Sequence, residues 1–355
     1  MSDWQGVRRL LCVRLDSIGD VLMTTPAIRA FRETLGCRIT LLGSGAGAAT
    51  APYLPEVDEV IEFAAPWMKA TGDAPGADSA VIERLRAAGF DAAAIFNVYS
   101  QSALPAAYLC TLAGIPLRLA HCRENPYRLL TDWVADPEPE KLVRHEVRRQ
   151  LDLAAAVGCT TANSRLSFHV PALARDAVAR EVACMKRPLV VVHPGASAAS
   201  RRYPPESYAR AIDLLIGETG CQAVFTGDVW ERELVRTVRK AMHRPSRSLV
   251  GRLDLGELGA LIDEADLLVS NNTGPAHLAA ALGTPVVDLY ALTNPQHTPW
   301  EVPSRVLNHD VPCRNCYKSV CPAGHHDCLR RVAPETVAAA ARDLLQLTSD
   351  QRLIA

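Results

Sequence analysis

The residues that could do chemistry gather at turns where an apolar run is followed by a helical pattern. Asp20 follows Gly19 in RLDSIGDVLMTTPAIRAF, residues 14–31, directly after the apolar run LLCV. In doubly wound folds this turn often binds a nucleotide phosphate, but a carboxylate would repel one. Asp20 is better suited to take a proton from a substrate hydroxyl. The alternative is a structural role, because a capping side chain stabilises a helix by about 1 kcal/mol.

A second turn, in SNNTGPAHLAAALG, has the features of an anion site. The apolar run LLVS leads through two asparagines into Thr273 and Gly274, and Pro275 suits the first helical position. Backbone N–H groups at a helix start, with the Thr273 hydroxyl, can bind a diphosphate. An ordinary capped helix is the alternative. His277, one turn further on, either faces the phosphates or fills a structural place.

A third turn, in VVVHPGASAASRRYPPESY, adds positive charge. Ser197 follows a predicted strand at the end where open α/β sheets bind their ligands. Arg201 or Arg202 can neutralise a diphosphate, because the N–H groups of a guanidinium match phosphate oxygens in pairs. A solvated pair of arginines is the alternative.

Four of the eleven cysteines crowd into residues 313–328 with the spacing C-x2-C-x4-C-x6-C. In a chain expected to be cytosolic, such a cluster suggests a metal more than disulfides. Four thiolates in a short loop can close a tetrahedral site for structural zinc or iron, and reduced thiols or a disulfide pair are the alternatives. The expected ligands are Cys313, Cys316, Cys321 and Cys328.

The elements that must position these turns follow from the hydrophobic pattern. Short apolar, β-branched runs alternate with amphipathic helical patterns in two series, which predicts parallel sheets in two Rossmann-like domains. Pro26 is expected to kink or restart the first helix. The expected strands are residues 10–15, 38–43, 59–63 and 92–98 in the first series, and 188–195, 222–228, 248–253, 265–271 and 284–290 in the second.

The stretch FHVPALARDAV separates the two series. We expect an N-terminal domain at 1–172, a second domain at 173–333, and a C-terminal helix at 334–355 that packs back toward the first domain. The first turn, DSIGDV, lacks the GxGxxG spacing of a dinucleotide fold, which argues against a dehydrogenase. Two such domains facing a central cleft are the GT-B architecture of glycosyltransferases, and periplasmic binding proteins can look similar.

The composition is that of an ordinary globular protein. The 355 residues suffice for two cores, and a net charge of −1 gives no indication of nucleic-acid binding. No apolar stretch approaches the ~20 residues of a membrane span, and the start of the chain lacks a signal-peptide pattern. A cytoplasmic location is expected. A peripheral contact with the cytoplasmic face of the inner membrane, through a loop at 66–79, is compatible with it.

The motifs in this order resemble glycosyltransferase family 9, the ADP-heptose:lipopolysaccharide heptosyltransferases. VRLDSIGDVLMTTPAIRAF, HPGA…RRYPPESY and SNNTGPAHLAAALGTPVVDLYALTNPQHTPW carry the resemblance. CRNCYKSVCPAGHHDC resembles a tail of heptosyltransferase II-like members. The resemblance implies a GT-B fold, an ADP-sugar donor on the C-terminal domain and an acceptor on the N-terminal domain.

The resemblance also implies residue roles. Asp20 matches the proposed general base, and Arg201 stands where the family has a phosphate-binding lysine. Well-known lipopolysaccharide members have Asp at the position of Asn272, where it touches the heptose, so this departure leaves the sugar and the acceptor open. The implied donor-binding residues are Ser197, Arg201, Glu231 at the ribose, Leu253 near the adenine, Asn272, Thr273, Gly274 and His277.

An anionic glycolipid, the lipopolysaccharide core, is the expected acceptor. The Arg- and His-rich segment 118–149 could meet it, although a solvated basic face is the alternative; the expected contacts are Gly19, Arg118, Arg123 and Arg128. The sequence thus predicts an inverting heptosyltransferase that needs no metal or cofactor for transfer. The alternatives are a heptosyltransferase with a protein or small-molecule acceptor, and a non-catalytic nucleotide-sugar-binding protein.

Overall fold

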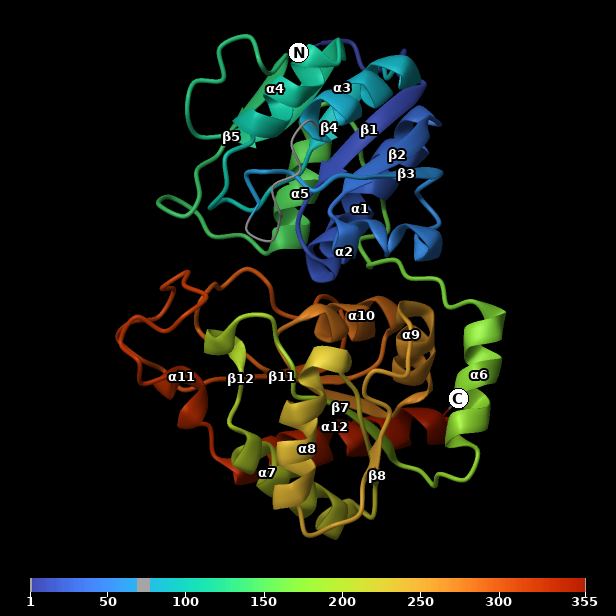
Figure 1. Ribbon diagram of the computed structural model, residues 1–355, viewed down its shortest axis with the longest axis vertical. Coiled ribbons are helices and arrows are strands. Elements are labelled where there is room, and N and C mark those ends of the chain that lie inside the picture. Colours follow the sequence, from blue (N-terminus) through green and yellow to red (C-terminus); the bar gives the residue numbers. More distant parts are fainter. Residues whose placement is uncertain (1, 69–76, 355) are drawn as a thin grey trace. The chain divides into compact units, whose positions relative to one another are not determined.

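The computed structural model describes residues 2–68 and 77–354, so much of the loop expected at 66–79 lies outside the described residues. The chain divides into two compact units, Met1–His169 and Val170–Ala355. Each unit contains one parallel six-stranded sheet flanked by helices (Figure 1). The predicted α/β class and the two Rossmann-like domains of the GT-B fold are confirmed. The predicted cleft between the domains and the domain boundaries at 172 and 333 stay predictions.

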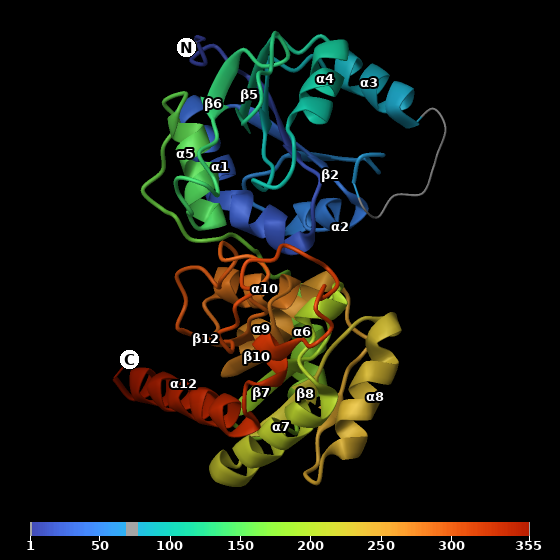
Figure 2. The same cartoon turned by 90° about the vertical axis from the view of Figure 1, so that its left-hand side faces the viewer.

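The first sheet has the strand order β3-β2-β1-β4-β5-β6. Its strands are β1 (Arg9–Arg14), β2 (Arg38–Gly43), β3 (Glu59–Glu62), β4 (Ala92–Ile95), β5 (Leu117–Cys122) and β6 (Asp132–Ala135). Its helices are α1 (Ile18–Leu35), α2 (Gly45–Ala48), α3 (Ala77–Ala88), α4 (Leu104–Leu112) and α5 (Glu146–Ala155), with a 3-10 turn η1 (Ala51–Tyr53). Helices α1 and α5 pack together on one face, and α3 and α4 cover the other (Figure 2).

Helix α1 runs unbroken through Pro26, where the sequence predicts a kink or a restart. Proline has no N–H to donate to the carbonyl of Leu22, one turn earlier. The hydroxyl of Thr25 donates to that carbonyl instead, at 2.7 Å. The freed acceptor is therefore satisfied locally, and the helix continues.

The second sheet has the order β12-β11-β10-β7-β8-β9. Its strands are β7 (Leu189–His193), β8 (Gln222–Phe225), β9 (Arg247–Ser248), β10 (Leu267–Asn271), β11 (Val286–Leu289) and β12 (Ser304–Leu307). Its helices are α6 (Ala172–Val182), α7 (Pro205–Thr219), α8 (Arg232–Ala241), α9 (Leu255–Glu264), α10 (Gly274–Leu282), α11 (Asp327–Arg330) and α12 (Pro334–Ile354), with 3-10 turns η2 (Ala199–Arg201) and η3 (Val229–Glu231). The central strands are buried on both faces, which explains their continuous apolar runs.

Helix α12 packs against α7 and the β10–β12 side of the second sheet. Arg342 of α12 pairs with Glu218 of α7 at 2.6 Å, and Tyr203 donates to the carbonyl of Val332 at 2.7 Å. These contacts place the helix within its own unit, and contact with the first unit stays a prediction. No helix in the described part of the chain is long and apolar enough to cross a membrane.

Candidate functional site

Each sheet has a switch point, where the order in which successive strands are added reverses, and polar side chains gather there. In the second sheet β7 lies between β10 and β8, so the loops that follow these three strands share the carboxyl edge. Open α/β sheets bind ligands at this edge. These loops and the start of α10 carry most of the residues predicted to bind the donor: Ser197, Arg201, Glu231, Asn272, Thr273, Gly274 and His277.

Asn271, at the end of β10, bonds to both ends of the loop after β7, a role that sequence reasoning did not assign. Its fully buried amide donates to the carbonyl of Pro194 at 2.7 Å and accepts from the N–H of Tyr203 at 3.0 Å. The loop that carries Ser197 and Arg201 is therefore fixed against β10. An asparagine at a strand end is common, so the residue type alone gave no signal.

Arg201 lies on η2 and is half-buried. It forms no ion pair with a carboxylate in the described part of the chain. Its charge lowers the pKa of the nearby Tyr290, although burial outweighs this and raises that pKa overall. Arg202, by contrast, is exposed and donates to the carbonyl of Ala196 at 2.7 Å. Arg201 is thus the arginine of the pair with an uncommitted guanidinium.

Glu231 stands directly over the backbone of the loop after β7. A Cβ added at Gly195 would lie 1.8 Å from Glu231 Oε1, so no larger residue fits there without moving Glu231. The other carboxylate oxygen accepts from the N–H of Asp228 at 3.0 Å. Burial raises the pKa of Glu231 and lowers that of His193 to about 4. His193 is therefore neutral at pH 7, and its 3.6 Å contact with Glu231 is not an ion pair.

Helix α10 begins immediately after β10. Thr273 is its N-cap by position, but its hydroxyl makes no capping bond to the helix, and Pro275 occupies the first turn. The local geometry thus leaves the Thr273 hydroxyl available at the positive end of a nine-residue helix. His277 is buried, which fits the structural alternative, and its contact with phosphate stays a prediction.

Two predicted donor residues differ from the others in setting. Ser197 is exposed on the loop after β7. Leu253 follows β9, which has two residues where the sequence predicts a strand over 248–253. Leu253 lines a groove beside α6 together with Val178. Its place next to an adenine stays a prediction.

In the first sheet the switch point lies between β1 and β4, and a buried arginine organises it. Arg14, the last residue of β1, is fully buried. It pairs with Asp16 at 3.1 Å, Asp20 at 3.3 Å and Glu146 of α5 at 3.0 Å. Burial opposes the charge of Arg14, but the three carboxylates outweigh it and raise its pKa.

Asp20 performs the structural role that the sequence left as its alternative. Its Oδ2 accepts from the backbone N–H of Ser17 at 3.1 Å and from the Ser17 hydroxyl at 2.6 Å, which forms a capping box. Its Oδ1 faces Arg14. The side chain keeps 17% of its surface exposed, so the cap does not bury the carboxylate. Gly19, next to it, is buried in the same turn.

Asp16 is a second carboxylate at this edge, and sequence reasoning missed it. Gln101 donates to its Oδ1 at 2.6 Å. Burial raises the pKa of Asp16 to about 6, although Arg14 works in the opposite direction. A perturbed carboxylate at a switch point is typical of functional sites. Its burial is a tertiary property, so the sequence held no signal for it.

The basic residues expected to meet an acceptor have different surroundings. The guanidinium of Arg118 is occupied by main-chain carbonyls, including Leu129 at 2.7 Å and Arg128 at 3.0 Å. The guanidinium of Arg123 lies 5.9 Å from the ring centre of Tyr99. Arg128 is exposed. Acceptor contact stays a prediction for all three, and for Arg118 it would require exchange of its present bonds.

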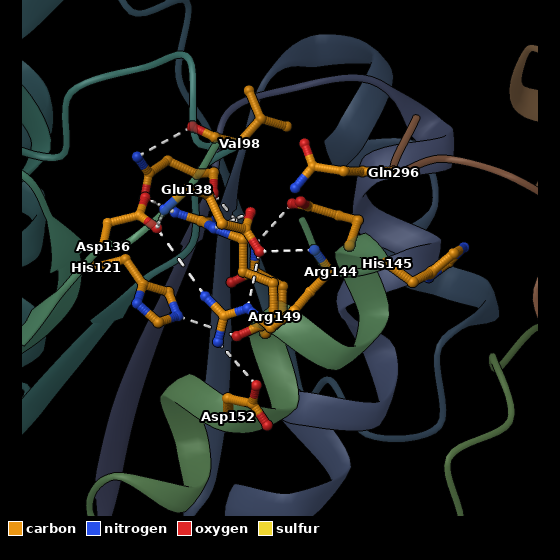
Figure 3. A network of polar contacts seen from close by, with 12 residues as sticks. Val98, His121, Asp136, Glu138, Arg144, His145, Arg149, Asp152 and Gln296 are labelled. Carbon is orange, nitrogen blue, oxygen red and sulfur yellow. Dashed lines mark hydrogen bonds and ion pairs between the residues drawn. The ribbon is translucent and has the colours of Figure 1, made fainter. Parts of the chain in front are cut away.

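Two further arginines of that segment belong to an internal network (Figure 3). Arg144 pairs with Glu138 and Asp152 at 2.8 Å each, and fully buried Arg149 pairs with Asp136 at 2.7 Å. The network joins α5 to the loop after β6. These arginines stabilise the unit rather than present free charge.

The metal centre predicted from the cysteine spacing is not supported. No group of three or more His, Cys, Asp or Glu side chains in the described residues is arranged to hold a metal ion. Cys313 instead faces His325, with 3.7 Å between Sγ and Nε2, and all eleven cysteines are free thiols. Two hydrogen bonds anchor the segment: the Tyr317 N–H donates to the Thr293 carbonyl at 2.8 Å, and the Ser200 hydroxyl donates to the Lys318 carbonyl at 2.9 Å. The segment is thus held without the four cysteines Cys313, Cys316, Cys321 and Cys328 converging on an ion.

Two doubly wound units, each with polar groups at its switch point, define a two-domain α/β protein of the Rossmann-like class. The sequence profile of glycosyltransferase family 9 (heptosyltransferase) matches residues 79–326, well over half of the chain. The chain belongs to glycosyltransferase family 9.

Curated relatives are named heptosyltransferases, and their alignments with this chain cover part of their length. Lipooligosaccharide heptosyltransferase 2 of Campylobacter jejuni is 26% identical over 187 residues, which cover 51% of this chain and 56% of that protein. Lipopolysaccharide heptosyltransferase 2 of Escherichia coli K12 is 29% identical over 240 residues, 63% of this chain and 68% of that protein. This chain therefore matches little more than half the length of the Campylobacter protein.

Solved structures match nearly the whole chain. A glycosyltransferase family 9 protein of Veillonella parvula superposes with a TM-score of 0.81 at 23% identity, covering 96% of this chain and 98% of that one. The ADP-heptose lipopolysaccharide heptosyltransferase II of E. coli gives 0.76 at 24% identity, covering 96% and 99%. At this identity the likeness shows the fold.

Proposed function

We propose that this protein is an inverting glycosyltransferase that moves a heptose from ADP-heptose to a lipopolysaccharide inner-core acceptor. The observation that carries the proposal is the carboxyl edge of the second sheet. There an uncommitted arginine, Arg201, and the start of α10 supply positive charge for a diphosphate. Glu231 lies at the same edge as a hydroxyl-binding carboxylate for the ribose. Membership of family 9 and the names of the relatives support this choice of substrates.

The chemistry assigned to the chain's own residues has two parts. The acceptor hydroxyl oxygen forms a bond to the anomeric carbon while that carbon's bond to the β-phosphate breaks, and the hydroxyl proton passes to Asp20. A positioned base of this kind contributes roughly 10²–10⁴-fold to the rate. Arg201 and the α10 turn stabilise the negative charge of the departing ADP, and such preorganised electrostatic stabilisation is often the larger effect.

The acceptor is tested by mass spectrometry of lipopolysaccharide from a strain that lacks the gene. Loss of one heptose, restored by the wild-type gene but not by an Arg201→Ala variant, is the expected result. An unchanged core would contradict a lipopolysaccharide acceptor. Membrane fractionation of the strain complemented with the wild-type gene tests the proposed site of action at the cytoplasmic face of the inner membrane.

A protein or small-molecule acceptor is the second candidate function. Asn272 favours this second candidate, because the well-known lipopolysaccharide heptosyltransferases of family 9 have aspartate at this position. Purified protein incubated with ADP-heptose and a cell extract would then label a protein or a small molecule, with no label in the lipopolysaccharide fraction. Absence of ADP release with every acceptor would favour a nucleotide-sugar-binding protein instead.

A further inference from the structure

A buried carboxylate lies behind the predicted sugar-contacting residue. Asp288, in β11, is fully buried, and its Oδ2 accepts a hydrogen bond from Asn272 Nδ2 at 3.1 Å. Its Oδ1 has no hydrogen-bond partner among the described residues. Burial raises the pKa of Asp288 to about 8, although the bond from Asn272 works in the opposite direction. A buried acid with one bond is costly, so its retention next to a binding edge calls for a reason.

The surroundings of Asn272 fix the orientation of its amide. One amide proton goes to Asp288, and the other goes to the carbonyl oxygen of His297 at 2.7 Å. An asparagine amide has two N–H donors and one acceptor oxygen. Both donors are therefore used, and Oδ1 is the amide atom not engaged within the described part of the chain. A reversed amide would set its oxygen against the carbonyl oxygen of His297, which can only accept.

Asn272 stands where the strand end meets the start of α10. It is the first residue after β10 and is followed by Thr273, the N-cap of α10, while β10 and β11 are neighbouring parallel strands. Asn272 therefore adjoins, along the chain, the Thr273–Gly274 turn assigned to the diphosphate. A sugar joined to that diphosphate would come within reach of Oδ1.

We propose that Asp288 is a positioning residue, which holds the amide of Asn272 so that Oδ1 accepts a hydrogen bond from a hydroxyl of the donor sugar. This inference rests on the proposed function, because it places a nucleotide sugar at this edge. Asp288 lies in β11, the strand next to β10, and contacts Asn272 rather than the sugar. A second carboxylate at position 272 would face Asp288 at hydrogen-bond distance, and two close carboxylates cannot both ionise readily.

The test measures affinity for ADP and for ADP-heptose separately, by titration calorimetry on the full-length protein. In Asp288→Leu the ADP-heptose affinity should fall about tenfold, the value of one hydrogen bond of about 1.4 kcal/mol, while ADP affinity changes less than twofold. Asp288→Asn keeps an acceptor oxygen, so it should stay within about threefold for both ligands. Asp176→Asn, on the exposed face of α6, is the matched control.

A double-mutant cycle tests whether Asp288 acts through Asn272. Asn272→Ala should lose the same preference for ADP-heptose, and adding Asp288→Leu should cause no further loss. Additive losses would overturn the proposal, because Asp288 would then act independently. Unchanged ADP-heptose affinity in Asp288→Leu would also overturn it. An equal loss for both ligands, with a lower melting temperature, would mean a purely structural role and overturn it as well.

The failure of the proposed function gives a different result. Wild-type protein that binds neither ADP nor ADP-heptose would remove the donor site itself and the inference with it. Wild-type protein that binds both equally would keep the nucleotide site but overturn the sugar contact at Asn272. A wild-type preference for ADP-heptose that is lost in Asp288→Leu and kept in Asp288→Asn supports the positioning role.

Discussion

Arg14 and Glu146 form an ion pair between β1 and α5, with 3.0 Å between Nη1 and Oε1 and both side chains fully buried. The pair ties the central strand to the helix that flanks the switch point. Gln150 also donates to the same oxygen of Glu146, at 2.7 Å. Arg14 therefore stabilises the fold through Glu146 and also pairs with the carboxylates of Asp16 and Asp20 at the sheet edge.

Removing Glu146 should destabilise the first unit. Glu146→Ala leaves part of a buried guanidinium uncompensated, which typically costs about 3–5 kcal/mol, and the remaining Asp16 and Asp20 place the expectation at the lower value. Chemical denaturation followed by circular dichroism measures the free energy of unfolding. Glu59→Ala removes an exposed pair with Arg38 and should cost under about 1 kcal/mol. Equal losses in the two variants would contradict a structural role for the buried pair.

Asp20→Asn should abolish transfer while ADP binding persists. The amide cannot take a proton, so turnover is expected to fall roughly 10²–10⁴-fold. Calorimetry with ADP and a coupled assay of ADP release separate the two effects. Because Asp20 also caps α1, the melting temperature of the variant must be compared with that of Ser17→Ala, which weakens the same cap and keeps the carboxylate. Near-full turnover in Asp20→Asn would remove Asp20 from the mechanism.

Arg201→Ala should weaken ADP binding. A hydrogen bond to a charged group contributes about 1.5–3 kcal/mol, which corresponds to roughly a 10- to 100-fold rise in Kd. Arg210→Ala is the control, because Arg210 is exposed on α7 and pairs with Glu335. The loss in Arg201→Ala should also shrink at high salt, as expected for a screened charge. Equal ADP affinity in both variants would exclude Arg201 from the diphosphate site.

The stability of the wild-type protein should depend on pH through Asp288. Its pKa is raised by burial from 3.8 to about 8, so the folded state holds a proton that the unfolded state has lost between these values. The contribution of Asp288 to stability therefore falls as pH rises from about 4 to about 8. Tyr208 of α7 and Tyr290 interact with Asp288, and burial raises the pKa of both, so they stay neutral in this range.

The measurement is the free energy of unfolding at several pH values from 5 to 9, for wild type and for Asp288→Asn. The free energy of unfolding of wild type should fall relative to that of Asp288→Asn as the pH rises toward 8, because only the wild-type carboxyl group titrates. A constant difference over this range would mean that Asp288 does not titrate on unfolding.

Transfer should not depend on the cysteine segment's thiols or on a divalent metal. Cys313→Ser and Cys316→Ser are expected to keep turnover within about twofold, and incubation with a chelator should leave the ADP-release rate unchanged. The reason is that Arg201 and the start of α10 supply the positive charge proposed for the leaving group. Loss of turnover after chelation, restored by zinc or iron, would contradict this expectation.

The alternating pattern of the sequence predicted the class of fold well, because parallel strands buried on both faces must be nearly continuous apolar runs. It located the turns after β1, β7 and β10, since glycine, proline and hydroxyl residues mark strand-to-helix transitions. It failed where local signals are weak. The two-residue β9 and the strands β5 and β6, within the segment interpreted as basic, depend on pairing with neighbouring strands.

The cysteine spacing shows the limit of motif reasoning. Residue type and interval allowed a metal centre, but ligand geometry depends on where each side chain points, and here Cys313 faces His325. The roles of the arginines also depend on where each side chain points. The sequence could not distinguish Arg118, whose guanidinium is bound to carbonyls, from Arg201, which is not paired with a carboxylate in the described residues.

The sequence by itself determined the two α/β domains, the order of the chemistry-bearing turns and the resemblance to family 9. These are properties of residue order and hydrophobic period, which act locally. Only the tertiary structure decided that three carboxylates share Arg14, that Asn272 is held by Asp288, and that Asp16 is a perturbed acid. Such relationships join residues up to 132 positions apart, and burial sets their energies, so they exist only once the sheets have formed.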